Sequence, residues 1–267
     1  MRRLSLLWFA ICCLAFCNAQ TEAPRYVSRH YQLGIGGVNI LDTYLSQEKF
    51  SGTGLTFLAT SEYSKGTRWS TLIQNQLQLS SGKDRADNES MLEGMYSFYF
   101  GRYYQLLGPN GDSSHKGRQE GLTISVGGIG TAGIGFIYNT RNGNNPAQAR
   151  AGIQIMPSAI GTYGFRLFRH NAMLRYQADL PLVGLVFSPN YGQSYYEIFS
   201  LGNYDHNIVP TTFVSQPTFR QQFIMAYRVS RRYSISLGYL GNYQQLKVNN
   251  LKQHVLGHHI MLGLMKN

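Results

Sequence analysis

The chain has 267 residues and a formal net charge of +11, yet only 14% of its residues are charged, while 43% are hydrophobic and 13% aromatic. Soluble domains carry roughly 25% charged residues and disordered chains are poor in aromatic residues, so the composition excludes a disordered chain and does not fit an ordinary soluble surface. Mean hydropathy is nonetheless slightly negative, because uncharged polar residues replace the missing charges.

The first 19 residues have the pattern of a secretory signal peptide. Arg2 and Arg3 precede an apolar run over 4–16, and Cys17-Asn18-Ala19 ends on the small residue that signal peptidase requires. We therefore expect 1–19 to be removed and 20–267 to form one exported domain. The alternatives are a membrane-anchoring helix, for which the run is shorter than the roughly 20 residues that span a bilayer, and a lipoprotein acylated on Cys17, which the bulky Phe16 disfavours.

All three cysteines (Cys12, Cys13 and Cys17) lie in this leader. The mature domain is therefore expected to have no disulfide, thiolate metal site or cysteine nucleophile. Its positive charge is not gathered in a basic helix or a Lys/Arg cluster, so nucleic acid is not an expected partner. The surplus favours anionic outer-membrane lipids or the phosphates of lipopolysaccharide.

After the leader, apolar and polar residues alternate along almost the whole chain. Leu174 and Tyr176, for example, alternate with Arg175 and Gln177. Successive side chains of a strand point to opposite faces, so each such segment has one apolar and one polar face. Twelve strands are predicted, with ten as the alternative count, over 30–38, 52–63, 68–80, 90–104, 120–129, 131–140, 148–156, 160–168, 170–180, 217–229, 232–243 and 254–265.

The length of these strands predicts a membrane protein. Many run for about 10 residues, as transmembrane strands do, and aromatic residues such as Trp69 and Tyr233 stand near their ends, as in the aromatic girdles of membrane barrels. A bilayer tolerates strands only when no edge is free. We therefore predict an all-β, antiparallel transmembrane β-barrel in a Gram-negative outer membrane, placed there by the barrel-insertion machinery.

The alternative to the barrel is a secreted, soluble β-sandwich that acts as a binding module, because its strands also alternate. The long segments, the low charge and the absence of turn signals every 8–12 residues disfavour it.

The polar faces predict the contents of the barrel. Longer links at 83–90, 109–119 and 141–146 are expected to be extracellular. The arginines on the polar faces are expected to pair with Asp179 and Glu62, or to favour anions in the lumen. The candidate lumen-lining residues are Arg150, Arg175, Asp179, Arg220 and Arg228.

The stretch 182–216 alternates only weakly, and an ordered loop of that length is usually functional. We interpret it as a plug or rim loop whose polar groups hydrogen-bond into the lumen. The candidate residues are Tyr191, Gln193, Ser194, Tyr195, Tyr196 and Glu197.

The same stretch supports a second hypothesis, an outer-membrane lipid hydrolase. Ser194 would be its nucleophile, His206 its base, and Asp205 or Glu197 the orienting acid. No G-x-S-x-G motif surrounds Ser194, so the non-enzymatic interpretation is favoured.

A cluster of histidines near the end of the chain is the one candidate metal site. His254 and His258 would share a face of the last strand, with His259 beside them. No carboxylate lies nearby in the sequence, so neither a metal nor another cofactor is expected.

Four stretches of the chain carry a family resemblance: 37–46 (GVNILDTYLS), 137–146 (IYNTRNGNNP), 188–199 (SPNYGQSYYEIF) and 238–243 (GYLGNY). With them the chain resembles a family of Bacteroidetes-type outer-membrane β-barrels catalogued as a domain of unknown function. The resemblance implies the compartment and no activity. The chain departs from many outer-membrane barrels by ending on Leu264-Met265-Lys266-Asn267 and not on an aromatic residue, which predicts a nonstandard insertion signal.

Together these observations predict a non-enzymatic outer-membrane barrel, acting as a small channel or an envelope scaffold. The residues do not specify its ligand, its protein partners or its oligomeric state.

Overall fold

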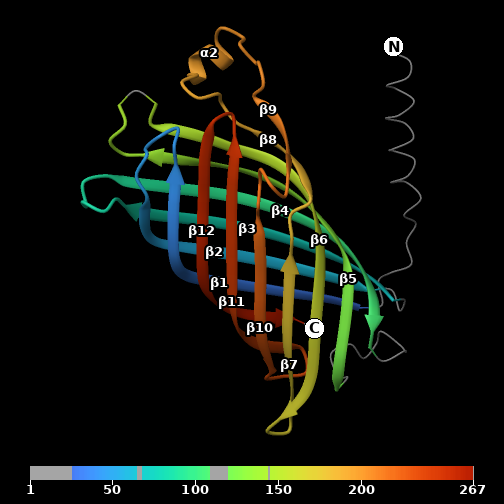
Figure 1. Ribbon diagram of the computed structural model, residues 1–267. Helices are drawn as coiled ribbons and strands as arrows, with labels where there is room; N and C mark the ends of the chain where they lie inside the picture. Colours follow the sequence, from blue (N-terminus) through green and yellow to red (C-terminus); the bar gives the residue numbers. More distant parts are fainter. Residues whose placement is uncertain (1–25, 65–67, 109–119, 144, 267) are drawn as a thin grey trace, which may run out of the picture.

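The computed structural model describes residues 26–64, 68–108, 120–143 and 145–266. Within these ranges the chain forms a single twelve-stranded antiparallel sheet (Figure 1). The strands are β1 (Tyr26–Asp42), β2 (Phe50–Ser64), β3 (Trp69–Lys83), β4 (Ser90–Leu107), β5 (Gly121–Asn139), β6 (Ala147–Leu167), β7 (His170–Asp179), β8 (Val183–Phe187), β9 (Ile208–Thr212), β10 (Phe219–Arg228), β11 (Tyr233–Val248) and β12 (Leu251–Lys266).

The sheet closes on itself. The ring runs β1-β2-β3-β4-β5-β6-β7-β10-β11-β12 and returns to β1, which makes a ten-stranded barrel. At the closing seam β1 pairs with β12 from Arg29 opposite Lys266 to Asp42 opposite Gln253. The predicted all-β, closed antiparallel barrel is thus confirmed.

The remaining two strands extend the barrel wall. Both β7 and β8 pair with β6, and the amides of Leu180 and Leu182 donate to the carbonyls of Pro157 and Ile155 at 3.0 and 3.2 Å, so β8 continues the line of β7. Strand β9 then pairs with β8. These two short strands and the helix α2 (Tyr195–Phe199) occupy the predicted loop region 182–216.

The outer surface is rich in apolar side chains, and many polar side chains are buried. Large apolar side chains such as Leu33, Ile35 and Leu262 are exposed on the outer surface, whereas Gln32 and Gln76 are buried in the interior. The apolar and polar faces predicted from the alternation therefore become the outside and the inside of the barrel. In the described part of the chain, no helix is long and apolar enough to cross a membrane.

Two predicted strand boundaries do not exist. The predicted strands 120–129 and 131–140 form the continuous β5, since Gly130 pairs with both Phe100 and Ile155. The predicted strands 148–156 and 160–168 form the continuous β6. Pro157 lacks an amide hydrogen, but it lies where the partner of β6 changes from β8 to β7, and its carbonyl still accepts from the Leu180 amide there.

The barrel has two distinct ends. At the terminal end β1 begins and β12 finishes, and β6 turns into β7; at the loop end lie the links 43–49, 84–89, 140–146 and 188–207. The predicted extracellular links 83–90 and 141–146 share the loop end. The third, 109–119, lies outside the described residues.

A charged substitution on the outer wall tests whether that wall faces lipid. Ile35 lies halfway along β1 and is 61% exposed. In a bilayer, Ile35→Arg is expected to lower the free energy of unfolding by about 2–4 kcal/mol, as at the midplane of other membrane barrels. Denaturant titration of the protein refolded into phospholipid vesicles measures the change.

Ser81→Arg, also on the outer face but near the end of β3, is the control and is expected to cost at most about 1 kcal/mol. Equal small effects of the two substitutions would mean that the wall faces water, where exposed substitutions change stability by about 0.5 kcal/mol or less.

Candidate functional site

A buried ion pair lies at the middle of the lumen. Arg220 on β10 lies directly opposite Asp179 on β7, and its Nη1 donates to Asp179 Oδ2 at 2.9 Å. The two side chains are 1% and 0% exposed. The Arg220 guanidinium also lies 4.6 Å from the ring centroid of Tyr99, and its Nε donates to Gln76 Oε1 at 3.3 Å.

Further donors complete the environment of the Asp179 carboxylate. Ser158 Oγ donates to Oδ1 at 2.5 Å, and Gln177 Nε2 donates to the two oxygens at 3.0 and 3.2 Å. Tyr103, in turn, hydrogen-bonds Ser158 at 2.8 Å. A buried charge is tolerated when it is paired and its remaining hydrogen-bonding sites are filled. We call Arg220, Asp179, Tyr99, Tyr103 and Ser158 the middle layer.

Two further ion pairs lie in the lumen on either side of the middle layer. Toward the loop end, Arg150 on β6 reaches Glu93 on β4 at 2.8 Å and also donates to Gln253 and Gln244. Toward the terminal end, Arg175 on β7 reaches Glu62 on β2 at 2.6 Å. Arg175 and Glu62 lie on opposite walls of the ring and tie them together. Arg150 and Glu93 lie on the two strands that flank β5, and Arg150 reaches β11 and β12 through its bonds to Gln244 and Gln253.

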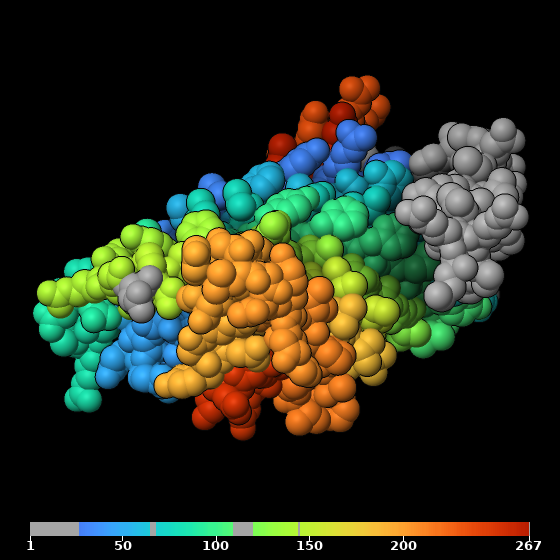
Figure 2. All heavy atoms as spheres, turned by 90° about the horizontal axis from the view of Figure 1, so that it is seen from above, coloured from blue at the N-terminus to red at the C-terminus, as the bar shows by residue number. Residues whose placement is uncertain are grey.

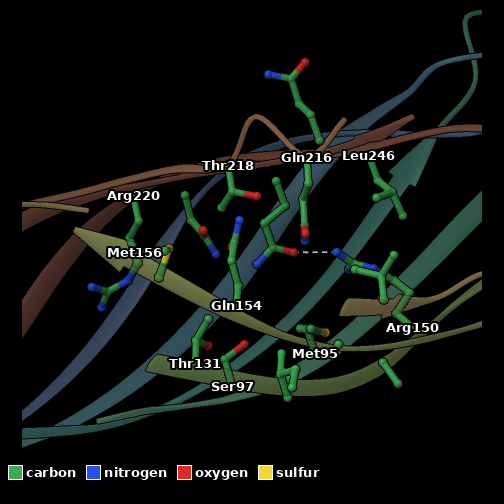
Figure 3. Close-up of a pocket in the computed structure, with 18 of the residues that line it drawn as sticks. Met95, Ser97, Thr131, Arg150, Gln154, Met156, Gln216, Thr218, Arg220 and Leu246 are labelled. Carbon is green, nitrogen blue, oxygen red and sulfur yellow. Dashed lines mark hydrogen bonds between the residues drawn. The ribbon is translucent and has the colours of Figure 1, made fainter. Parts of the chain in front are cut away.

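The middle layer stands between two internal cavities. The upper cavity, on the side of the loop end, has a volume of about 90 Å³. Arg150 and Arg220 lie on opposite sides of it, with Gln154, Gln216 and Thr218 between them (Figure 3). The lower one, of about 130 Å³, is lined by Glu62, Arg175 and Arg228 among others. The two cavities share no lining residue.

The structure places the predicted lumen residues as follows. Arg150, Asp179 and Arg220 are buried inside, Arg175 is nearly so, and Arg228 lines the lower cavity. The pairs Arg220–Asp179 and Arg175–Glu62 form. Sequence reasoning missed Glu93. Its signal was an acid on the polar side of a predicted strand, but nothing in the sequence connects that position to Arg150.

The loop 188–207 lies over part of the loop end and not inside the lumen (Figures 1 and 2). Gln193 holds its base together: its carbonyl accepts from Tyr44 Oη at 2.9 Å, and its Oε1 accepts from Asn207 Nδ2 at 2.7 Å. Asn249, in the turn between β11 and β12, donates to the carbonyls of Ser188 and His206 at 3.2 and 2.9 Å.

Tyr195 fixes this loop to the barrel rim. Its hydroxyl accepts from the Ala149 amide at 2.7 Å, and its ring packs edge-on against Tyr44 and beside Phe187. Burial raises the pKa of Tyr195 to about 12 and also raises the pKa of Tyr44, so both rings stay neutral anchors. Tyr191 and Tyr196, by contrast, point into solvent.

The four residues of the hydrolase hypothesis form two separate pairs. Ser194 is the N-cap of α2: its Oγ accepts from the Glu197 amide at 3.2 Å, and Glu197 Oε2 accepts from the Ser194 amide at 2.7 Å. His206 and Asp205 contact each other at 2.5 Å and are both largely exposed. No hydrogen bond in the described residues connects one pair to the other.

The three histidines of β12 do not converge. His254 and His258 are on the outer face, where His258 Nδ1 contacts the Tyr239 and Tyr243 hydroxyls at 2.6 and 3.2 Å, while His259 is buried inside. Over the described ranges, no group of three or more His, Cys, Asp or Glu is arranged to hold a metal ion.

Several solved structures have a similar fold. The outer membrane protease OmpT from Escherichia coli is 10% identical, with a TM-score of 0.53 over 92% of this chain and 99% of that one. The transport unit of the autotransporter AIDA-I from Escherichia coli is 8% identical, with a TM-score of 0.45 over 93% and 92%. The translocator domain of the autotransporter NalP from Neisseria meningitidis is 9% identical, with a TM-score of 0.42 over 99% and 96%.

At such low sequence identity these likenesses show the fold alone. No curated protein matches the sequence. One family model does, described as "Protein of unknown function (DUF3316)", and it covers residues 4–267. The chain therefore belongs to the DUF3316 family.

Proposed function

We propose that this protein is a non-enzymatic barrel of a Gram-negative, Bacteroidetes-type outer membrane. Residues 1–19 would be its signal peptide, 20–267 its mature domain, and the barrel-insertion machinery its partner during assembly. Support comes from the outward apolar wall and from the aromatic pair of Trp69 and Tyr104, whose rings lie 5.1 Å apart near one end of it. Paired aromatic rings at strand ends are typical of a membrane interface.

Within that setting we propose that the barrel is a closed envelope scaffold and not an open channel. The observation that carries this choice is the middle layer, because Arg220 and Asp179 are fully enclosed and their hydrogen bonds reach from β10 to β7, β6 and β3. A permeating ion would have to break these bonds and leave a charge unpaired in the interior, which is costly.

The loop end is the part of such a scaffold best suited to binding other molecules. Its loop 188–207 is held by the Gln193 and Asn249 hydrogen bonds, while large apolar side chains on it stay exposed. Exposed apolar groups on an ordered segment mark interaction sites more often than chance. The exposed set is Tyr191, Tyr196, Phe199, Leu201 and Tyr204.

Planar-bilayer conductance tests whether the lumen is closed. Wild-type protein is expected to give no stepwise conductance. The double variant Asp179→Ala/Arg220→Ala removes both members of the middle pair, so no charge is left unpaired and the space between the two cavities opens. This variant is expected to conduct.

Glu62→Ala/Arg175→Ala is the matched control, because it removes an ion pair and leaves the middle layer intact. It is expected to stay silent. Heat-modifiable gel migration shows which variants are folded barrels. Stepwise conductance by the wild type would overturn the closed scaffold in favour of a channel.

Substitutions of Ser194 separate the scaffold from the hydrolase. An N-cap requires an acceptor oxygen, which aspartate supplies and alanine does not. Ser194→Ala is therefore expected to lose about 1 kcal/mol of local stability, seen as roughly fivefold faster hydrogen exchange at the Glu197 amide, whereas Ser194→Asp stays near wild type.

A lipid hydrolase that used the Ser194 hydroxyl would behave differently. Phospholipid and lipid A hydrolysis would be measurable in the wild type and lost in both variants, including the one that keeps the cap. That result would replace the scaffold by the enzyme.

A further inference from the structure

The terminal end carries a concentration of exposed cations. Two carboxylates are described there, and both are paired: Glu62 with Arg175 inside the lumen, and Glu120 with Arg166 on the surface at 2.7 Å. The exposed basic residues, which we call the basic collar, are Arg29, Arg68, Arg102, Arg166, Arg169, Arg231, Arg232 and Lys266.

The loop end is different in both balance and type of charge. Its cations are mostly lysines, and the carboxylates described at that end, buried ones included, are at least as numerous, as in the exposed Lys83–Asp87 pair at 2.6 Å. The collar is almost all arginine. Arginine binds phosphate through two parallel hydrogen bonds and is less strongly hydrated than lysine. Of the two ends of the barrel, the terminal end is therefore the one suited to binding phosphate groups.

The collar adjoins the aromatic side chains that mark the membrane interface. Arg102 lies 5.4 Å from the Trp69 ring centroid and donates to Thr71 at 2.8 Å on the outer face of the barrel. Arg29 and Lys266 are directly opposite each other at the β1–β12 seam. Like charges in this position destabilise a sheet unless an anion lies between them.

The tightest turn of the terminal end is strained. Phe168 and Arg169 join β6 to β7 with φ of +47° and +69°, a region in which bulky side chains are rare. The corresponding turn at the loop end has Asn249 and Asn250 at +52° and +59°, and asparagine tolerates that backbone. Phe168 is also 83% exposed. Phe168 and Arg169 are both held in an unfavourable backbone conformation, with the phenyl ring exposed. We infer that their side chains make contacts with molecules outside the chain.

We propose that the basic collar binds the phosphate groups of anionic phospholipids in the membrane leaflet at the terminal end. This proposal rests on the proposed membrane location and adds the lipid class and the residues. The aromatic rings set the depth at the interface, and the arginines then lie level with the lipid phosphates. Each such charge near an anionic surface strengthens binding about fivefold at low salt.

Lipid titration of the intact purified protein, followed by native mass spectrometry, tests the collar. The probes are dioleoyl phosphatidylglycerol and, as the zwitterionic reference, dioleoyl phosphatidylethanolamine. Wild type is expected to bind phosphatidylglycerol more tightly. Arg231→Gln/Arg232→Gln is expected to weaken that binding about fivefold for each charge removed, whereas Lys247→Gln/Lys252→Gln, which removes two exposed charges at the loop end, leaves it unchanged.

A second variant separates binding from folding. Arg169→Asn places a tolerant residue in the strained turn, so the barrel is expected to become slightly more stable toward denaturant while phosphatidylglycerol binding weakens. A purely structural role would move both quantities in the same direction.

Three results would overturn the proposal: equal binding of the two lipids by wild type, equal losses in the two double variants, or displacement of the lipid by millimolar sn-glycerol 3-phosphate, which would identify a site for soluble anions. Heat-modifiable migration of every variant is recorded first. A failure of lipid selectivity in folded barrels is thereby distinguished from a failure of the proposed membrane barrel itself.

Discussion

The pairing of β1 with β12 is the constraint on which the rest of this structure depends. Backbone N–H and C=O groups that face hydrocarbon cannot be left unpaired, so a sheet in a bilayer has to close. Close approach at that seam has a sequence requirement of its own, because a Cβ on Gly36 would collide with the backbone carbonyl of His258. Once the seam is formed, the period-two alternation can satisfy only one arrangement, with Leu33 and Ile35 outside and Gln32 inside.

Closure also determines the chemistry of the interior. A ten-stranded ring is narrow, so the long polar side chains of opposite walls meet, and each buried charge needs a partner within the ring. Arg220 pairs with Asp179 on the adjacent strand and Arg150 pairs with Glu93 two strands away, whereas Arg175 reaches across the lumen to Glu62. The ion pairs therefore fill the barrel and hold its walls in register at the same time. A closed lumen is the consequence of packing these groups, and it moves any function to the two ends.

The sequence predicts the parts of this arrangement that depend on local pattern. Alternation assigns Arg150, Arg220 and Asp179 to the inner face, because a strand residue can point in only two directions. The same reasoning cannot identify Glu93 as the partner of Arg150, since that contact depends on the order and register that bring β4 and β6 together on either side of β5. The sequence pattern also predicts a break in β5 at Gly130 and in β6 near Pro157, because glycine and proline weaken an isolated strand. In the barrel both strands are continuous, since neighbouring strands on both sides provide backbone hydrogen bonds. Ser194 and His206 are close in sequence, yet Ser194 caps a helix and His206 lies in a solvent-exposed turn.

The two ends of the closed barrel differ in how the backbone of their tight turns is stabilised. At the loop end, polar side chains satisfy the backbone: Asn249 adopts its left-handed turn without strain and donates to the carbonyls of the loop beside it. At the terminal end, Phe168 and Arg169 occupy the equivalent conformation against their preference and offer their side chains outward. Internal contacts explain the first turn. Nothing within the described barrel explains the second, and since strain persists only where the surroundings compensate it, the compensation has to come from what the terminal end touches. A leaflet of anionic phosphates above a hydrocarbon boundary matches both an arginine and an exposed phenyl ring.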